Sequence, residues 1–211
     1  TKDILSTKYY FNNEDNYVNS QGIYINQEKV IDLEDIVLKG THNYENILAM
    51  LMVMELLHVD FKYAISVLKE FKGVEHRIEF VRDYKGVSYY NDSKSTNPTA
   101  TITALKSFSG NIHLILGGMD RSQDFNDLKP YLSKIKKIYA IGEVRGRIED
   151  FCKENNVSYV TRETLSEAME EVNKNTIEGD VVVLSPGSAS WDQYAKFEDR
   201  GDEFKELVSK L

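Results

Sequence analysis

The sequence has few of the residues that build disulfide frameworks or metal clusters. It contains one cysteine, Cys152, so the chain has no internal disulfide, and an unpaired thiol is typical of a reducing compartment such as the cytosol. The four histidines show no spacing that pairs two of them as metal ligands, and we assign no residue of the chain to a metal. For His113, which lies inside an apolar run, we expect a hydrogen-bonded histidine in the core.

Long apolar runs and an excess of positive charge are also absent. No stretch approaches the ~18 consecutive apolar residues that a membrane-spanning helix needs. The chain of 211 residues has a formal net charge of -8, which disfavours nucleic acid or an anionic membrane surface as a partner. Its 41% of hydrophobic and 28% of charged residues are ordinary for a globular domain. We therefore expect a cytoplasmic globular protein that binds neither nucleic acid nor membrane.

The common short motifs of nucleotide binding and nucleophilic catalysis are missing as well. No glycine is followed by lysine, so the chain has no G-x-x-x-x-G-K-[ST] phosphate loop, and it has no G-x-G-x-x-G fingerprint. No Ser-His-Asp or Cys-His arrangement suggests itself. Any nucleotide-dependent chemistry must therefore use other residues, or residues outside this chain.

The first part of the chain predicts a small unit of short strands followed by two helices. Clusters of Asn, Asp and Gly separate four β-rich stretches, over residues 9–11, 17–18, 22–25 and 29–33. Helices are expected over residues 44–58 and 61–71. Gly73 ends this part, because glycine readily adopts the left-handed conformation that caps a helix.

From residue 75 onward, strands and helices alternate. The expected strands lie over residues 78–81, 87–90, 112–116, 138–141, 158–160 and 181–184. Two of them, 112–116 and 181–184, are almost wholly apolar, which is typical of central parallel strands covered on both faces. The pattern predicts an α/β protein in which residues 74–211 form a Rossmann-like domain with a mostly parallel sheet.

The most informative polar segment is residues 91–98 (NDSKSTNP), directly after the strand predicted over 87–90. Asn97 is a suitable N-cap and Pro98 a suitable first residue for the helix that follows. A helix N-terminus attracts anions, and Lys94 strengthens that attraction. In an open α/β sheet, ligands bind at such strand ends. The alternative is an ordinary polar turn.

Residues 40–46 (GTHNYEN) open the first predicted helix. Asn43 and Asn46 are three positions apart and therefore share one face of its first turn. Two side-chain amides there could read the donor and acceptor edge of a purine. The alternative is that Asn43 is merely an N-cap.

Two more segments follow the buried strands. In residues 117–125 (GGMDRSQDF), paired glycines let a backbone pass close to a ligand, and Arg121 can grip a carboxylate with two parallel hydrogen bonds. The alternative there is a flexible connection with a solvated arginine. In residues 185–193 (SPGSASWDQ), small residues make a tight turn whose amides can point at an anion. Trp191, the only tryptophan, has the alternative of a core anchor.

Parallel strands end at a common edge of a sheet. The segments after residues 90, 116 and 184 therefore emerge together, and Lys94, Thr96, Arg121 and Ser190 are expected to converge. Two cations and several hydroxyls at one edge predict an anionic ligand that carries a carboxylate.

In order and spacing, these motifs resemble the Mur ligase family of ATP-dependent, amide-forming ligases. The stretches that carry the resemblance are GTHNYEN (40–46), EHRIE (75–79), NDSKSTNP (91–98), LGGMDRSQDF (116–125) and LSPGSASWDQYAKFEDRGDEF (184–204). The segment Asn91 to Lys94 points to the member of the family that adds D-glutamate. The resemblance extends over nearly the whole chain.

The resemblance implies that residues 1–73 are the C-terminal part of a central ATPase domain and residues 74–211 a C-terminal Rossmann-like domain. The phosphate loop, the UDP site and the magnesium ligands would then lie upstream of Thr1. The implied cofactors are ATP and Mg²⁺, the implied substrates D-glutamate and UDP-N-acetylmuramoyl-L-alanine, and the implied state a monomer. We expect the isolated chain to be inactive.

The resemblance also implies roles for individual residues. Lys94 would be catalytic, near the reacting carboxylate or phosphate. The residues expected to bind the nucleotide are Asn43 and Asn46 at the adenine, Asp92 at the ribose and Arg77 at a phosphate. The residues expected around D-glutamate are Thr96, Arg121, Ser190, Trp191 (through its backbone) and Phe197.

One residue departs from the family's pattern. Many members carry lysine where Arg121 stands, and an arginine keeps the charge but replaces a point charge by a planar fork. Two other interpretations stay open: a ligase related to folylpolyglutamate synthetase, and a non-catalytic module that holds an anionic metabolite.

Overall fold

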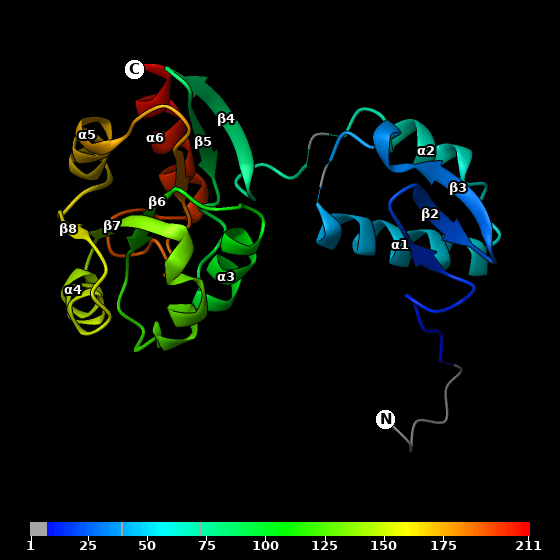
Figure 1. The fold of residues 1–211 in the computed structure, drawn as a ribbon, viewed down its shortest axis with the longest axis horizontal. Helices are drawn as coiled ribbons and strands as arrows, with labels where there is room; N and C mark the ends of the chain where they lie inside the picture. The colour runs from blue at the N-terminus through cyan, green and yellow to red at the C-terminus, as the bar shows by residue number, and fades with distance from the viewer. Residues whose placement is uncertain (1–7, 39, 72) are drawn as a thin grey trace. The chain divides into compact units, whose positions relative to one another are not determined.

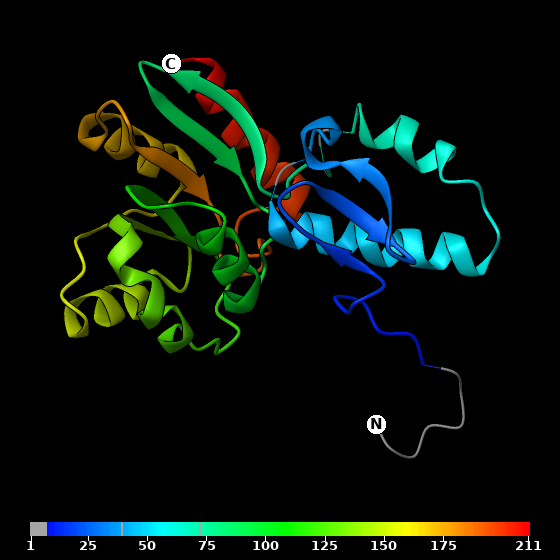
Figure 2. The same ribbon diagram turned by 45° about the vertical axis from the view of Figure 1, so that its right-hand side comes forward.

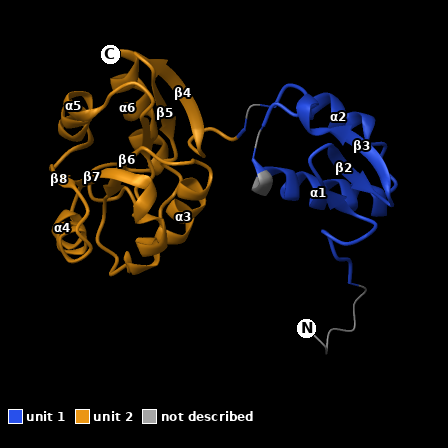
Figure 3. Ribbon diagram, viewed as in Figure 1, with its two compact units in different colours: residues 1–73 blue, residues 74–211 orange. Residues whose placement is uncertain are grey.

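The computed structural model describes residues 8–38, 40–71 and 73–211. The chain divides into two compact units, unit 1 at residues 1–73 and unit 2 at residues 74–211 (Figure 3). No helix in these described ranges is long and apolar enough to cross a membrane.

Unit 1 is a small antiparallel sheet packed on two helices. Its elements are β1 (Tyr17–Val18), β2 (Gly22–Ile25), β3 (Glu28–Asp32), the 3₁₀ turn η1 (Leu33–Asp35), α1 (Thr41–Leu56) and α2 (Lys62–Leu68). Asn26 and Gln27 both have positive φ, as a two-residue hairpin between β2 and β3 requires. Isoleucines of the sheet pack against Leu48 and Leu51 of α1 to form the core.

The prediction of a strand over residues 9–11 of this unit is wrong. Residues 9–11 form no strand, and Tyr9 and Tyr10 lie 59% and 65% exposed. The stretch is aromatic enough for a strand, but it has no partner in the three-stranded sheet, whose order is β1-β2-β3. Aromatic content alone does not make a strand without a neighbour to pair with.

Unit 2 is built on a six-stranded sheet with the order β4-β5-β9-β6-β7-β8. Its strands are β4 (Glu79–Tyr84), β5 (Val87–Asn91), β6 (Ile112–Gly117), β7 (Ile135–Ile141), β8 (Tyr159–Thr161) and β9 (Val181–Leu184). The edge strand β4 pairs antiparallel with β5, and every other pairing is parallel. The predicted α/β class with a mostly parallel sheet is therefore confirmed.

Helices cover both faces of this sheet (Figures 1 and 2). They are α3 (Pro98–Lys106), η2 (Asn126–Lys134), α4 (Arg145–Glu154), α5 (Leu165–Asn175) and α6 (Phe197–Ser209). Because side chains alternate along a strand, Leu114 and Leu116 of β6 pack with α3, η2 and α4, whereas Ile115 packs with α5 and α6. A strand that is apolar at every position is therefore buried on both sides, as its sequence predicts.

The predicted start of α3 is also confirmed. The side chain of Asn97 accepts a hydrogen bond of 2.9 Å from the backbone N–H of Ala100, and Pro98 is the first helical residue. This cap sets the point at which the segment after β5 turns into a helix.

His113 of β6 is a core histidine, as expected. Its ring nitrogens lie 2.9 Å from the Tyr139 hydroxyl and 3.1 Å from the carboxylate of Asp180, which Lys136 also contacts. Burial lowers the pKa of His113, although Asp180 acts in the opposite direction. His113, Lys136 and Asp180 lie at or just before the starts of their strands, toward the sheet edge opposite the one described next, and Tyr139 lies further along β7.

Candidate functional site

The loops that follow β5, β6 and β9 meet at the carboxyl edge of the parallel sheet. Three backbone hydrogen bonds of 2.8–2.9 Å join them, from Gly187 N to Ser95 O, from Gly117 N to Pro186 O, and from Met119 N to Ala189 O. The loop after β9 is the middle one, since β9 lies between β5 and β6 in the sheet. The expected convergence of the three segments is therefore present in the fold.

The glycine pair after β6 makes this close packing possible. Gly117 and Gly118 have φ of 126° and 146°, where an L side chain is strained. A Cβ would lie 2.1 Å from the carbonyl oxygen of Ile141 at the first glycine and 2.4 Å from that of Ala189 at the second. The pair thus admits neighbouring protein backbone. The expectation that a ligand also passes close to these glycines stays a prediction.

Asp92 is buried beneath the loop after β9. Its Oδ2 accepts hydrogen bonds from the hydroxyls of Ser95 (2.5 Å) and Ser185 (2.6 Å), and its Oδ1 accepts one from the backbone N–H of Ile78 (3.2 Å). Burial raises the pKa of Asp92 to about 6, against the effect of these hydrogen bonds and of the charge of Arg77. The carboxyl group therefore joins three chain segments, and its expected contact with a ribose stays a prediction.

Lys94 is exposed and lies against an aromatic ring. Its Nζ is 5.7 Å from the centre of the Phe197 ring, within the range of a cation–π contact. The hydroxyl of Ser93 donates to the carbonyl of Phe197 at 2.8 Å, which holds the start of α6 beside the loop after β5. Thr96 is half-buried two residues further on. Lys94, Thr96 and Phe197 are thus brought to one corner of the site.

Arg121, the second predicted cation, also lies against an aromatic ring, that of Trp191. Its Cζ is 5.5 Å from the centre of the Trp191 ring. Trp191 itself is 63% exposed, so the alternative interpretation of this residue as a core anchor is wrong. Both predicted cations therefore lie against aromatic side chains of residues 191–197, the segment that leads into the first residue of α6.

Ser190 precedes this tryptophan and is almost completely buried, with 2% of its surface exposed. Its Oγ has no hydrogen-bond partner among the residues that the structure describes. A buried hydroxyl without a partner is costly, and a ligand that supplied one would remove that cost.

Three more predicted residues lie outside the loops that follow β5, β6 and β9 in the sequence. Arg77 is exposed and precedes β4, and its backbone N–H donates to the carbonyl of Val74. Asn43 and Asn46 belong to unit 1, in the first turn of α1, with Asn43 half-buried and Asn46 exposed. Their expected role at an adenine stays a prediction.

Comparison with known proteins now adds to this geometry. The family model "Mur ligase, glutamate ligase domain" matches residues 76–187. The chain belongs to the Mur ligase family. It is 40% identical over 196 residues to a UDP-N-acetylmuramoylalanine--D-glutamate ligase of Bacillus mycoides, which covers 92% of this chain and 44% of the relative. It is 37% identical to the ligase of that name from Macrococcus caseolyticus, over 99% of this chain and 48% of the relative.

Solved structures of the family share the fold. A UDP-N-acetylmuramate-alanine ligase from Thermotoga maritima matches 89% of this chain and 42% of its own, with a TM-score of 0.65 and 18% identity. A bifunctional folylpolyglutamate synthase/dihydrofolate synthase from Yersinia pestis matches 90% of this chain and 43% of its own, with a TM-score of 0.56 and 15% identity. The chain spans about half the length of the curated relatives that it matches.

Arg200 is a residue of this Mur ligase site that sequence reasoning missed. It is 1% exposed, and its guanidinium donates to the carbonyl of Ser188 and to both the carbonyl and the hydroxyl of Ser93, at 2.9–3.2 Å. Burial lowers its pKa to about 10, so it stays charged at neutral pH. Arg200 thus fixes the loop after β5 to the loop after β9 and places a positive charge beneath both.

A signal for this arginine exists in the sequence. Arg200, Phe204 and Val208 recur at intervals of four and are all buried on one face of α6. A charged residue at the first position of such an apolar stripe indicates a buried polar contact at the helix start. Its partners lie outside the helix, Ser188 at 12 residues and Ser93 at 107 residues along the chain, and the pattern within α6 predicts neither.

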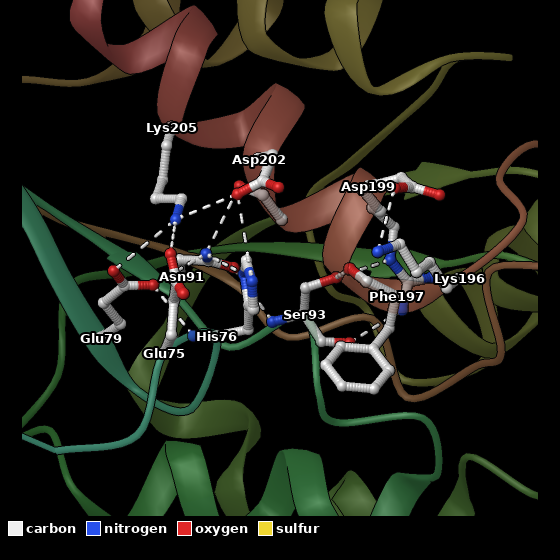
Figure 4. A network of polar contacts seen from close by, with 12 residues as sticks. Glu75, His76, Glu79, Asn91, Ser93, Lys196, Phe197, Asp199, Asp202 and Lys205 are labelled. Carbon is white, nitrogen blue, oxygen red and sulfur yellow. Dashed lines mark hydrogen bonds and ion pairs between the residues drawn. The ribbon is translucent and has the colours of Figure 1, made fainter.

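Sequence reasoning also missed a polar network between β5 and α6 (Figure 4). The side-chain amide of Asn91 donates to His76 Nδ1 (3.0 Å) and to Glu79 (3.1 Å). Lys205 of α6 pairs with Asp202 at 3.0 Å and also contacts Glu75. This network, here called the His76 network, fastens the start of unit 2 to α6.

Part of the His76 network has the composition of a metal site. Glu75, His76 and Asp202 each offer a ligand atom, all within 4.8 Å of one another. However, the Lys205 ammonium pairs with both carboxylates, and Asn91 donates to His76 Nδ1. A neutral ring then carries its proton on Nε2, which faces Asp202. Because the ammonium of Lys205 already neutralises both carboxylates, the cluster does not fit a metal ion.

Proposed function

We propose that this chain belongs to an ATP-dependent ligase that adds D-glutamate to UDP-N-acetylmuramoyl-L-alanine during peptidoglycan precursor synthesis. Residues 1–73 would be the end of its central ATPase domain and residues 74–211 its C-terminal domain. The observation that supports this best is the carboxyl edge of unit 2. There Lys94 and Arg121 lie against aromatic rings, and the buried hydroxyl of Ser190 has no partner among the described residues.

The reaction that we propose proceeds in two steps. The carboxylate of UDP-N-acetylmuramoyl-L-alanine takes the γ-phosphoryl group of ATP and becomes an acyl phosphate. The amine of D-glutamate then attacks the acyl carbon, and the tetrahedral intermediate expels phosphate. Both steps develop negative charge on oxygen, so fixed positive charge and positioning are what the protein must supply.

Each predicted residue has a place in this proposal. Lys94 would neutralise charge on the reacting carboxylate or phosphate. Arg121 would bind a carboxylate of D-glutamate, since its guanidinium can form two parallel hydrogen bonds. The other residues proposed to surround D-glutamate are Thr96, Ser190, Phe197 and the backbone N–H of Trp191.

The proposed nucleotide contacts are the ones that the resemblance implies. We propose Asn43 and Asn46 for the adenine, Asp92 for the ribose and Arg77 for a phosphate. Mg²⁺ would assist phosphoryl transfer by neutralising phosphate charge. We place its ligands outside this chain, because the His76 network does not fit a metal ion.

The full-length enzyme tests the proposal directly. Phosphate release from ATP should require UDP-N-acetylmuramoyl-L-alanine and D-glutamate together, and L-glutamate should not replace D-glutamate. The 211-residue chain alone should release no phosphate. Release with L-glutamate and a folate in place of these substrates would favour the ligase related to folylpolyglutamate synthase, whose fold the chain shares. No turnover with either set would favour a non-catalytic module.

Arg121→Ala tests the residue assignment separately. Loss of the guanidinium should raise the KM for D-glutamate by about tenfold or more, because a charge-assisted hydrogen bond contributes ~1.5–3 kcal/mol. The KM for ATP should change little. An equal rise of both KM values would contradict the placement of Arg121 at the amino acid.

A further inference from the structure

Trp191 lies where a tryptophan is least expected. Residues 182–190 before it are all buried, yet the indole is 63% exposed. Large aromatic side chains usually stabilise a fold by leaving water, and this one does so only in part. Its close neighbour is the guanidinium of Arg121, with Cζ 5.5 Å from the ring centre. The indole therefore contacts the arginine at the surface and adds little to the buried core.

The backbone beneath Arg121 is held in place. Its N–H donates to the side chain of Gln123 at 2.8 Å, and the amide of Gln123 donates to the hydroxyl of Ser188. Arg147 donates to the carboxylate of Asp120 and to the carbonyl of Gln123, both at 2.7 Å. The loop after β6 is thus fastened on both sides of Arg121, and only the long side chain remains to be oriented.

The backbone beneath Trp191 is held in the same way. The backbone N–H groups of Gln193 and Tyr194 donate to the carbonyl of Ser190, and the amide of Gln193 donates to the carbonyl of Glu163 at 2.7 Å. The contact between Arg121 and Trp191 therefore joins two chain segments whose backbones are held by hydrogen bonds.

The guanidinium of Arg121 is available to a ligand. No carboxylate within the described parts of the chain forms an ion pair with it, and the neighbouring Asp120 is engaged by Arg147. A guanidinium that lies over an indole can still turn its N–H groups toward a carboxylate, which it can bind through two parallel hydrogen bonds. The unpartnered hydroxyl of Ser190 belongs to the residue next to Trp191. A carboxylate is the group that fits both.

We propose that Trp191 is a positioning residue, whose indole face orients the guanidinium of Arg121 so that its edge receives one carboxylate of the amino-acid substrate. This inference rests on the proposed function. A lysine at position 121 would present a point charge with no plane to orient, although its ammonium could still lie over the ring. The indole should therefore matter more when residue 121 is arginine than when it is lysine.

A double-mutant cycle on the full-length enzyme tests this coupling. Trp191→Leu should raise the KM for D-glutamate about two- to fivefold, the change that an exposed cation–π contact supplies. It should leave kcat and the KM for ATP unchanged, whereas Trp191→Phe, which keeps an aromatic face, should restore most of the affinity. In the Arg121→Lys background, Trp191→Leu should raise the KM for D-glutamate by a clearly smaller factor, because a lysine has no plane for the indole to orient.

Two results would overturn the proposal. One is an equal rise of the D-glutamate KM on Trp191→Leu in the arginine and lysine backgrounds, and the other is a fall in kcat with an unchanged KM. Turnover by the unaltered enzyme reports on the proposed function itself, so the two failures can be told apart.

The stack can also be tested without any substrate, in the 211-residue chain. Because Trp191 is the only tryptophan, acrylamide quenching of its fluorescence reports on the indole alone. Arg121→Ala should increase quenching by uncovering one face of the ring. Arg82→Ala, which changes an arginine that lies over the ring of Tyr84 instead, is the matched control and should have a smaller effect. Equal quenching in the Arg121→Ala chain and the unaltered chain would show that the stack does not form.

Discussion

The carboxyl group of Asp92 should make the stability of unit 2 depend on pH in an unusual direction. Most aspartates bind their proton less tightly in the folded state, because native partners favour the charge. Asp92 does the opposite: burial raises its pKa to about 6 from 3.8, despite three hydrogen bonds. The folded chain therefore binds this proton more tightly than the unfolded chain does, by about 3 kcal/mol.

The sign of the effect follows from linkage. A group with a raised pKa in the folded state contributes stability that is complete below pH 3.8, where both states are protonated. That contribution is lost as pH rises through about 6. Between pH 4.5 and pH 7.5, Asp92 should remove about 2 kcal/mol from the free energy of unfolding. Other carboxyl groups, such as that of Asp180, whose pKa is lowered, act in the opposite direction and must be subtracted.

Asp92→Asn provides that subtraction. An asparagine has nearly the same shape, and the hydroxyls of Ser95 and Ser185 can turn to accept from its amide. Urea unfolding followed by Trp191 fluorescence, at several pH values, gives the free energy of unfolding of both chains. From pH 4.5 to pH 7.5, the free energy of unfolding of the variant should rise by about 2 kcal/mol relative to that of the unaltered chain. Asp83→Asn removes an exposed carboxylate from β4 and controls for the loss of charge.

Two outcomes would refute the reasoning. A difference between the Asp92→Asn chain and the unaltered chain that stays constant with pH would mean that the carboxyl group has the same pKa folded and unfolded. A difference that changes in the opposite direction would mean that its hydrogen bonds outweigh burial. A chemical-shift titration of the carboxyl carbon would then show which of the two holds.

Three further predictions concern single side chains of the site. Arg200→Met should lower the free energy of unfolding by about 2–5 kcal/mol, because it leaves the buried carbonyls of Ser93 and Ser188 without donors. A loss below about 1 kcal/mol in urea unfolding would contradict this. Gly201→Ala should lower the thermal midpoint, because its Cβ would lie 2.3 Å from Nδ1 of His76, whereas Gly146→Ala, with no atom within 4 Å of its Cβ, should not. Ser190→Ala removes a hydroxyl without a partner among the described residues, so stability should change by less than about 0.5 kcal/mol while the KM for D-glutamate rises. An unchanged KM in a steady-state assay would place Ser190 outside the amino-acid site.

Much of unit 2 could be predicted because its signals are local. The apolar runs at residues 112–116 and 181–184 are central strands, since an apolar side chain at every position requires cover on both faces. The N-cap at Asn97 depends on contacts within one turn. The meeting of three loops also followed, because parallel strands must end at one edge.

The failures of prediction share one cause. The expected strand at residues 9–11 lacks a partner, and whether a strand has a partner depends on the rest of the sheet. Trp191 was open to interpretation as a core anchor because tryptophan usually buries most of its surface, but the turn that carries it faces outward. Neither outcome can be decided within a window of ten residues.

By itself, the sequence determined the α/β class, the order of strands and helices in unit 2, and the chemical types that gather at the carboxyl edge of its sheet. These follow from periodicity, caps and motif spacing, which are properties of neighbouring residues. Only the tertiary structure decided the raised pKa of Asp92, the burial of Arg200 and the contact of Arg121 with the ring of Trp191. Each of these depends on how much water is excluded by residues far away in the chain, and that exclusion exists only once the chain has folded.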